Sequence, residues 1–224
     1  SLPPGSTVTL AVLEFDESLV LKHTGAMRYN SMNATDDFEI SGNIASLCFG
    51  DNFTGHKTMP DYAYDQLFWT NNLVSAENLY LGSYTSVSNH GFYMTFHFCS
   101  SLETAPDFSS ITSVGDYGMY QTFHTCDGMA EAPDLSSVTS VGDYGMYETF
   151  VQCTFPYAPD LSSVTSVGNR GMLQMCYLCE YMEDAPDLSS VTSVGDYGMN
   201  AMFRGCSSLE TPPDLSSLTS VGTS

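Results

Sequence analysis

The chain contains few basic residues. Of its 224 residues only five are lysine or arginine, against 26 aspartates and glutamates, and the formal net charge at pH 7 is −21. Proteins that grip the phosphate backbone of nucleic acids need clustered cations, so this balance argues against a nucleic-acid partner. It argues equally against docking on an anionic membrane surface. Such a charge is typical of an exposed surface that repels other copies of itself.

Long apolar runs are also missing. No run approaches the ~20 apolar residues that a membrane-spanning helix needs, so we expect no membrane insertion. The sequence starts without methionine and without a basic and apolar leader, which suggests a mature chain or a fragment. Scarce lysine with abundant serine, threonine, tyrosine and glycine resembles the composition of secreted proteins. We therefore expect an extracellular, cell-surface or virion location.

Signatures of catalysis are absent as well. The five histidines are scattered, and the sequence has no HExxH, no glycine-rich phosphate loop and no nucleophile elbow. Hydrolysis at a pair of acidic residues stays conceivable, but no spacing singles out one pair. We predict that the protein is not an enzyme and carries no cofactor, with calcium as the one alternative considered below.

What the sequence has in abundance is internal repetition. A Pro-Asp dipeptide returns every 26 or 27 residues, and the fullest unit reads APDLSSVTSVGDYGMYETFVQC. A fixed period in this range indicates a solenoid, whose stacked repeats share one continuous core. We predict a solenoid over 41–224, with a degenerate first repeat at about 56–82. The dipeptides are Pro106-Asp107, Pro133-Asp134, Pro159-Asp160, Pro186-Asp187 and Pro213-Asp214.

Each unit divides into three expected elements. We predict an extended segment over 102–105, a β-branched strand over 111–114, and one to two helical turns over 117–125. Apolar residues at i, i+4 and i+7 would form one helical face: Met119, Phe123 and Cys126. The fold class expected is thus an α/β-type repeat solenoid with short parallel strands and short helices.

Residues 1–40 do not repeat, and we predict a small N-terminal β segment there. Apolar and polar residues alternate over 7–15 and over 18–23, which predicts a β-hairpin. A loop over 24–37 and a short strand over 38–40 would follow.

Several phrases of the repeat resemble a known family. MFRGCSSLETPPDLSSLTSVG and SSVTSVGDYGM resemble the leucine-rich repeats of BspA-like surface proteins of gut Bacteroidetes and their phages. SGNIASLCFGDNFTG, followed by LVSAENLYL, is similar to the entry segment of such arrays. The resemblance covers roughly 40–224, although Cys176 replaces the expected phenylalanine and residues 1–40 match weakly. It implies a right-handed solenoid on an exported or virion-borne protein, often one linked to adhesion.

Positions that stay constant between repeats are expected inside, and positions that vary are expected on the exterior of the helices. The constant slots are Met119, Met146, Met172 and Met199; Phe96, Phe123, Phe150 and Phe203; and Val114, Val141, Val167 and Val194. The varied slots, together with a row of tyrosines, make a candidate surface for a host protein or a surface glycan, because tyrosine suits both kinds of partner. Packing between repeats is the alternative role for the tyrosines. The candidate binding residues are Tyr93, Tyr120, Tyr147, Gln121, His124, Glu148 and Arg204.

The cysteines form one column, with a single slot per repeat: Cys99, Cys126, Cys153, Cys179 and Cys206. A stacked column gives no cysteine a unique disulfide partner, so we predict structural thiols. Cys176-x-x-Cys179 looks like half of a redox or zinc motif. However, Cys179 belongs to the column and Cys176 fills the phenylalanine slot, so we predict no metal there.

Two rows of aspartates run along the array. Like charges about 5 Å apart repel each other, so such rows need solvent, screening or a cation. Calcium is one interpretation of the first row. Hydrogen bonding is the other: an Asx-type turn in the first row and a helix N-cap in the second. Asn78 and Asn169, which each fill one rung, favour hydrogen bonding. The rows are Asp107, Asp134, Asp160, Asp187 and Asp214, and Asp116, Asp143 and Asp196.

Together these patterns predict a non-enzymatic surface protein that displays a face for adhesion or receptor recognition. One alternative is a filament or fibre subunit that self-associates through its C-terminal end. The sequence stops after the strand at Val221 with no polar capping repeat in view. Another alternative is a carbohydrate-binding protein.

Overall fold

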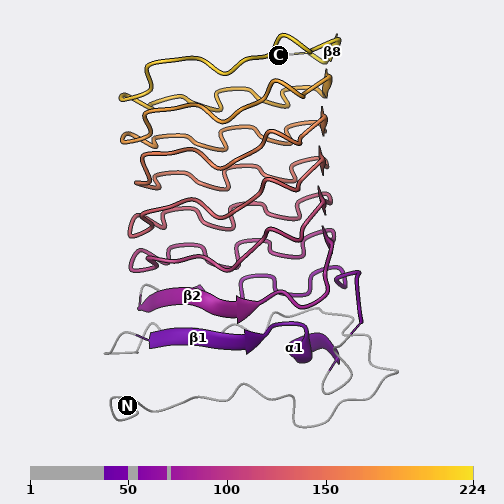
Figure 1. Cartoon of the computed structure of the whole chain (residues 1–224), viewed down its shortest axis with the longest axis vertical. Coiled ribbons are helices and arrows are strands. Elements are labelled where there is room, and N and C mark those ends of the chain that lie inside the picture. Colours follow the sequence, from indigo (N-terminus) through magenta and orange to yellow (C-terminus); the bar gives the residue numbers. More distant parts are fainter. Residues whose placement is uncertain (1–37, 50–54, 70–71, 224) are drawn as a thin grey trace.

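The chain winds into a stack of similar coils (Figure 1). The computed structural model describes residues 38–49, 55–69 and 72–223. The stack begins with β1 (Phe38–Asn43), which pairs in parallel with β2 (Leu73–Tyr80). The strand predicted over 38–40 is therefore confirmed. The hairpin predicted over 7–23 and the loop over 24–37 lie outside the described residues.

Six two-residue strands form a parallel ladder along one edge of the stack. Each strand is a Ser-Val pair, and in every pairing serine lies opposite serine and valine opposite valine. This unbroken register establishes the predicted repeat solenoid. The strands are β3 (Ser86–Val87), β4 (Ser113–Val114), β5 (Ser140–Val141), β6 (Ser166–Val167), β7 (Ser193–Val194) and β8 (Ser220–Val221).

The predicted helices are wrong. Among the described residues the only helix is α1 (Ser46–Phe49), and residues 117–125 form a run of tight turns instead. We call this run, over 116–126 and its equivalents in the other coils, the turn segment. Along the turn segment, successive backbone amides alternate between an acceptor in the next coil and an acceptor three residues back. Tyr117 donates to the Asp143 carbonyl one coil away at 2.9 Å, whereas Gly118 donates back to Gly115 at 3.0 Å.

This alternation explains why a helix does not form. A helix satisfies its amides within its own segment, whereas here every second amide bonds the neighbouring coil. The turn segment must then adopt a left-handed conformation at every fourth residue: φ is 55° at Tyr117, 48° at Gln121 and 59° at Thr125. Each costs about 1–2 kcal/mol for a residue other than glycine. Only in the last coil does glycine fill such a slot, at Gly205 (φ 86°).

The constant slots line the core, as predicted. Phe123 is fully buried and stacks on Phe96 and Phe150, with ring centroids 5.3 Å and 5.8 Å away. Burial weakens in the last coil, where Met199 and Phe203 are only half-buried. Within the described residues β8 pairs only with β7, and Val221 is 64% exposed.

The cysteine column is structural, as predicted. All seven cysteines of the chain lie in the described part, and none is in a disulfide. Each thiol of the column donates to a main-chain carbonyl one coil below, for example Cys126 to Phe96 at 3.0 Å. A hydrogen bond with Cys179, together with burial, raises the pKa of Cys176. A raised pKa keeps a thiol protonated and unreactive, which suits a structural role for the Cys-x-x-Cys pair.

Candidate functional site

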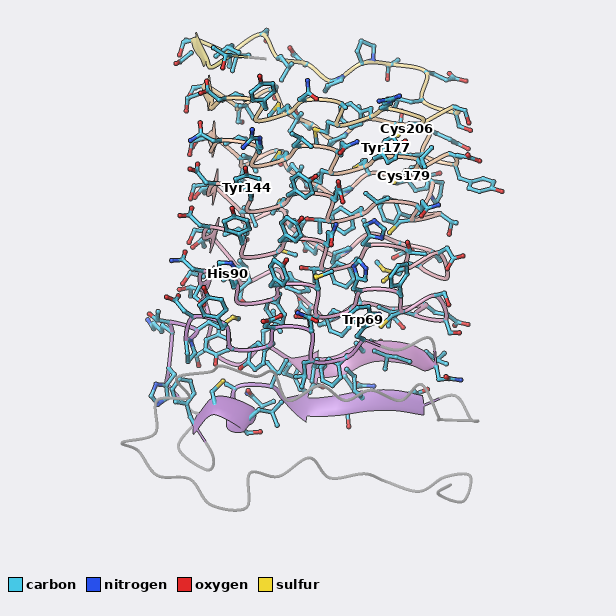
Figure 2. All side chains as sticks on the ribbon, turned by 180° about the vertical axis from the view of Figure 1, so that it is seen from behind. Trp69, His90, Tyr144, Tyr177, Cys179 and Cys206 are labelled. Carbon is cyan, nitrogen blue, oxygen red and sulfur yellow. The ribbon has the colours of Figure 1, made fainter. Side chains whose placement is uncertain are left out.

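The candidate binding residues all lie on the turn segments, which together form one side of the solenoid that we call the turn face. Figure 2 labels His90 and Tyr144 near the edge of the short strands, and Trp69 and Tyr177 farther across. Because the coils stack in register, equivalent residues of successive turn segments lie above one another and form columns. We expect neighbours in a column to be spaced like neighbouring strands, about 4.8 Å apart.

Two columns of aromatic rings dominate the turn face. In the first, Tyr120 stacks on Tyr93 and on Tyr147, with centroids 4.8 Å apart in both pairs and ring planes within 9°. In the second, Tyr117 lies 4.8 Å from His90 and 4.7 Å from Tyr144. Tilted contacts of 5.8 and 5.9 Å join the columns. We call these six residues the aromatic grid: His90, Tyr93, Tyr117, Tyr120, Tyr144 and Tyr147.

Ring stacking decides which part of each tyrosine a partner can touch. Both faces of Tyr120 are covered by its neighbours in the column, and the ring is half-buried. The part left for a partner is the ring edge with the phenolic hydroxyl. Burial foremost, then the neighbouring Tyr93 and Glu148, raises the pKa of Tyr120 to about 12. The hydroxyl therefore stays protonated near pH 7 and both donates and accepts hydrogen bonds.

Polar side chains from two coils meet beside the first column. The Gln121 Nε2 donates to the Glu148 Oε2 at 2.6 Å. Glu148 also lies close enough to Tyr147 to raise the pKa of that phenol, after the larger effect of burial. The structure thus brings together six of the seven residues predicted from the sequence. The seventh, Arg204, is exposed but lies three coils away from His124, in the turn segment after β7.

An arginine that sequence analysis did not select completes the second column. The Arg170 Cζ lies 5.3 Å from the ring centroids of both Tyr144 and Tyr197. Its Nη1 also donates to the Tyr144 hydroxyl. A guanidinium is planar and stacks on aromatic rings, so it replaces a ring here without breaking the column. The signal that could have found it was alignment, since Arg170 occupies the slot of Tyr144 and Tyr197 in the repeat.

The aspartate rows serve the backbone. In the first row each carboxylate accepts from the amide two residues on, as Asp107 does from Ser109 at 2.8 Å. The same bond recurs at Asp134, Asp160, Asp187 and Asp214. This confirms the Asx-type turn, and the bonds from Ser109 hold the pKa of Asp107 below its usual value. Within the described residues no group of three or more His, Cys, Asp or Glu is placed to hold a metal, and calcium stays an untested alternative.

The second row is not a set of helix caps, because there is no helix to cap. Asp116 accepts from the Asp143 amide one coil away at 2.9 Å. Asn169 keeps the same arrangement and accepts from the Asp196 amide at 2.9 Å. An amide oxygen can replace the carboxylate because the bond needs only an acceptor, which is why asparagine is tolerated in this row.

Comparison with known proteins gives a similarity among solved structures. No family model matches the chain, and no curated protein matches it. Among solved structures, the chain is similar to a leucine-rich repeat protein from Bacteroides ovatus, with 18% identity and a TM-score of 0.43. The alignment covers 64% of this chain and 33% of that protein, so this chain spans about a third of its length.

No helix among the described residues is long and apolar enough to cross a membrane. The expected extracellular location and the expected self-association through the C-terminal end stay predictions.

The varied slot that holds His97, His124 and Val151 is not exterior in every coil, contrary to the expectation for varied positions. His97 and Val151 are only 5% and 4% exposed, whereas His124 is half-buried. His97 contacts Trp69 edge-on at 5.4 Å and stacks on His124 at 4.7 Å. Burial, and to a lesser degree the charge of His124, lowers the pKa of His97 to about 4. Rings from two neighbouring coils thus enclose a neutral imidazole.

The buried His97 predicts a loss of stability in mild acid. Its folded-state pKa lies below the unfolded value of about 6.5, so the unfolded chain binds the extra proton. The stability that the neutral His97 imidazole contributes is therefore fully present above about pH 6.5. It is lost as the pH falls from there toward 4. We expect a loss of about 2 kcal/mol between pH 7 and pH 5 from this residue, measured by urea unfolding. His97→Val, which copies the residue that Val151 places in the same slot, should reduce the loss. A variant with the full pH dependence of the wild type would contradict this role.

Proposed function

We propose that this protein is a non-enzymatic binding protein that acts outside a cell or on a virion. Its turn face, centred on Tyr120 and Tyr147, recognises a host protein or a surface glycan in adhesion or receptor recognition. The observation that carries the proposal is the aromatic grid, flanked by the Gln121–Glu148 hydrogen bond. These residues occupy slots that vary in polarity along the array, whereas the inward slots stay apolar.

Rigidity supports a recognition role. The backbone under the grid bonds the next coil through alternate amides, for instance Gln121 to the Tyr147 carbonyl at 2.9 Å. Each ring is also held by its neighbours in the column. A partner would therefore meet side chains already fixed in place, and binding would cost little conformational entropy. Tyrosine suits this use, because it has only two side-chain torsions and carries both apolar and polar atoms.

The proposal is tested by comparing two tyrosine variants in binding to host-cell surfaces. The double variant Tyr120→Ser, Tyr147→Ser removes two rings of the grid. The control, Tyr157→Ser, removes a ring that is 64% exposed but lies outside the turn segments. Loss of central aromatic residues costs about 2 kcal/mol or more at protein interfaces, so we expect the double variant to bind about thirtyfold more weakly. The control should bind like the wild type.

Binding would be measured with fluorescently labelled protein on a panel of host cells and on immobilised glycans. Circular dichroism of each variant checks that it is folded. If the double variant is folded and retains full binding to every surface that the wild type binds, the turn face is not the recognition surface.

A further inference from the structure

If the proposed function holds, the chemical groups exposed on the turn face restrict the class of partner that the face can bind. Sugars usually bind aromatic residues through the ring face. In the first column that face is closed at Tyr120, which is sandwiched at 4.8 Å on both sides. The same slot in the coils beyond holds Asp65 below Tyr93 and Leu173 above Tyr147. What this column offers is a row of ring edges and phenolic hydroxyls.

Carboxylates border the aromatic grid on more than one side. Glu148 lies close enough to raise the pKa of both Tyr120 and Tyr147, although burial has the larger effect. At the lower end Asp65 acts in the same way on Tyr93, again after burial. Along the second column, Asp116 and Asp143 are close to Tyr117. Hydroxyls and carboxylates arranged in this way are acceptors for a cationic donor.

The Glu148 carboxylate has acceptor capacity to spare. Its Oε2 accepts from Gln121 at 2.6 Å, the carboxylate is also hydrogen-bonded to the Tyr147 hydroxyl, and the side chain is half-buried. An ionised carboxylate has about four lone-pair positions, so a third donor can be accommodated. Charge-assisted hydrogen bonds from arginine or lysine are about twice as strong as neutral ones.

One guanidinium of the protein itself already packs against tyrosine rings on the turn face. Arg170 lies between Tyr144 and Tyr197 at 5.3 Å from each ring, and it donates to the Tyr144 hydroxyl. The neighbouring column has phenols in the same stacked arrangement at Tyr120 and Tyr147, but the next residue in that slot is Leu173. It therefore has phenolic acceptors and a carboxylate without a guanidinium of its own in that slot.

From these observations we infer that the turn face binds a cationic protein segment, whose arginine or lysine side chains donate to the phenols of Tyr120 and Tyr147 and to the carboxylate of Glu148. This inference rests on the proposed function and specifies its partner. Overall charge favours it, because the chain carries 26 acidic and only five basic residues. Complementary charge of this kind accelerates encounter and selects partners.

The test uses a fluorescein-labelled peptide of alternating arginine and serine, with a glutamate–serine peptide for comparison. Affinity is measured by fluorescence anisotropy at about 150 mM salt, where exposed charges more than about 8 Å apart are largely screened. We compare Glu148→Gln, which keeps an acceptor for Gln121, with Tyr120→Phe, which keeps the ring stack and removes the hydroxyl. The matched control is Glu131→Gln, because Glu131 is exposed outside the turn segments and the charge change is the same.

We expect the arginine peptide to bind and the glutamate peptide not to bind. Glu148→Gln should weaken binding about tenfold and Tyr120→Phe about threefold, which correspond to about 1.4 and about 0.7 kcal/mol and lie in the range for the loss of one hydrogen bond. Glu131→Gln should change the affinity by less than about twofold. Equal weakening by Glu148→Gln and Glu131→Gln would mean general charge attraction and would overturn the inference, as would the absence of peptide binding.

The cell-binding assay separates this inference from the proposed function. If Tyr120→Ser, Tyr147→Ser abolishes cell binding while the arginine peptide does not bind or compete, the turn face is a recognition surface for another partner. A glycan bound by the wild type and lost in the double serine variant would likewise overturn the cationic partner and leave the proposed function standing. Full cell binding by the double serine variant would overturn the proposed function, whatever the peptide does.

Discussion

Replacing Phe123 with alanine is expected to lower the free energy of unfolding by about 3–5 kcal/mol. Phe123 is fully buried, lies between the rings of Phe96 and Phe150, and meets Phe108 edge-on at 6.0 Å. The coils above and below are tied by backbone hydrogen bonds, so they cannot close over the cavity. Urea denaturation followed by circular dichroism measures the change in midpoint and slope.

Phe123→Leu is the graded comparison and should cost clearly less, because it keeps most of the buried volume. A decreased slope in Phe123→Ala would indicate that the array now unfolds in parts, as repeat proteins do when an interface between neighbours is weakened. A loss below about 1 kcal/mol would contradict a close-packed phenylalanine column.

Replacing Gly142 with alanine is expected to cost about 3 kcal/mol, the upper part of the range for overpacking. A Cβ there would lie 2.8 Å from the Gly115 carbonyl carbon and 2.6 Å from the Asp116 Oδ1. The main chain cannot retreat easily, because the Gly142 amide donates to Val114 in the coil below at 2.8 Å. Thermal and urea unfolding of the variant measure the cost.

The control for Gly142→Ala is Glu131→Ala in the same coil, which should stay within about 0.5 kcal/mol of wild type because Glu131 is exposed. Wild-type stability in Gly142→Ala would mean that the coils lie farther apart at the strand end than the hydrogen bonds imply. The in-register stacking of the short strands would then have to be revised.

The solenoid and its inward slots could be predicted because repetition reports burial independently of backbone shape. A residue such as Val141 is kept from unit to unit when the core demands it, whether the segment is a helix or a run of turns. The Asx-type turns of the first aspartate row were predictable for another reason, because the hydrogen bond is local. The Asx turn at Asp107 is local, and its acceptor lies two residues from its donor.

The helices were predicted wrongly because the two backbones share a spacing. The turn segment repeats its conformation every four residues, so Met119 and Phe123 point inward together, as they would on a helix. The left-handed residues carry no signal, since Tyr117, Gln121 and Thr125 are not residue types that favour positive φ. The cause is a hydrogen bond to the next coil, which lies 26 or 27 residues away and is invisible to local propensity.

The candidate site was found in part. Alignment of the repeat placed Tyr93, Tyr120 and Tyr147 in one slot and Gln121 beside Glu148 in the next, and the structure brings them together. The alignment could not reveal that the rings stack face to face, because stacking depends on the spacing of the coils. For the same reason Arg170 was missed as part of a tyrosine column, and distant Arg204 was grouped with residues that lie two to four coils away.

The turn face as a recognition surface is tested most directly by one comparison on host cells that the wild type binds. Labelled wild type, Tyr120→Ser, Tyr147→Ser and the control Tyr157→Ser are titrated side by side, each verified as folded. We predict that the double variant binds about thirtyfold more weakly while Tyr157→Ser binds like the wild type. Equal binding by all three proteins would contradict recognition through Tyr120 and Tyr147.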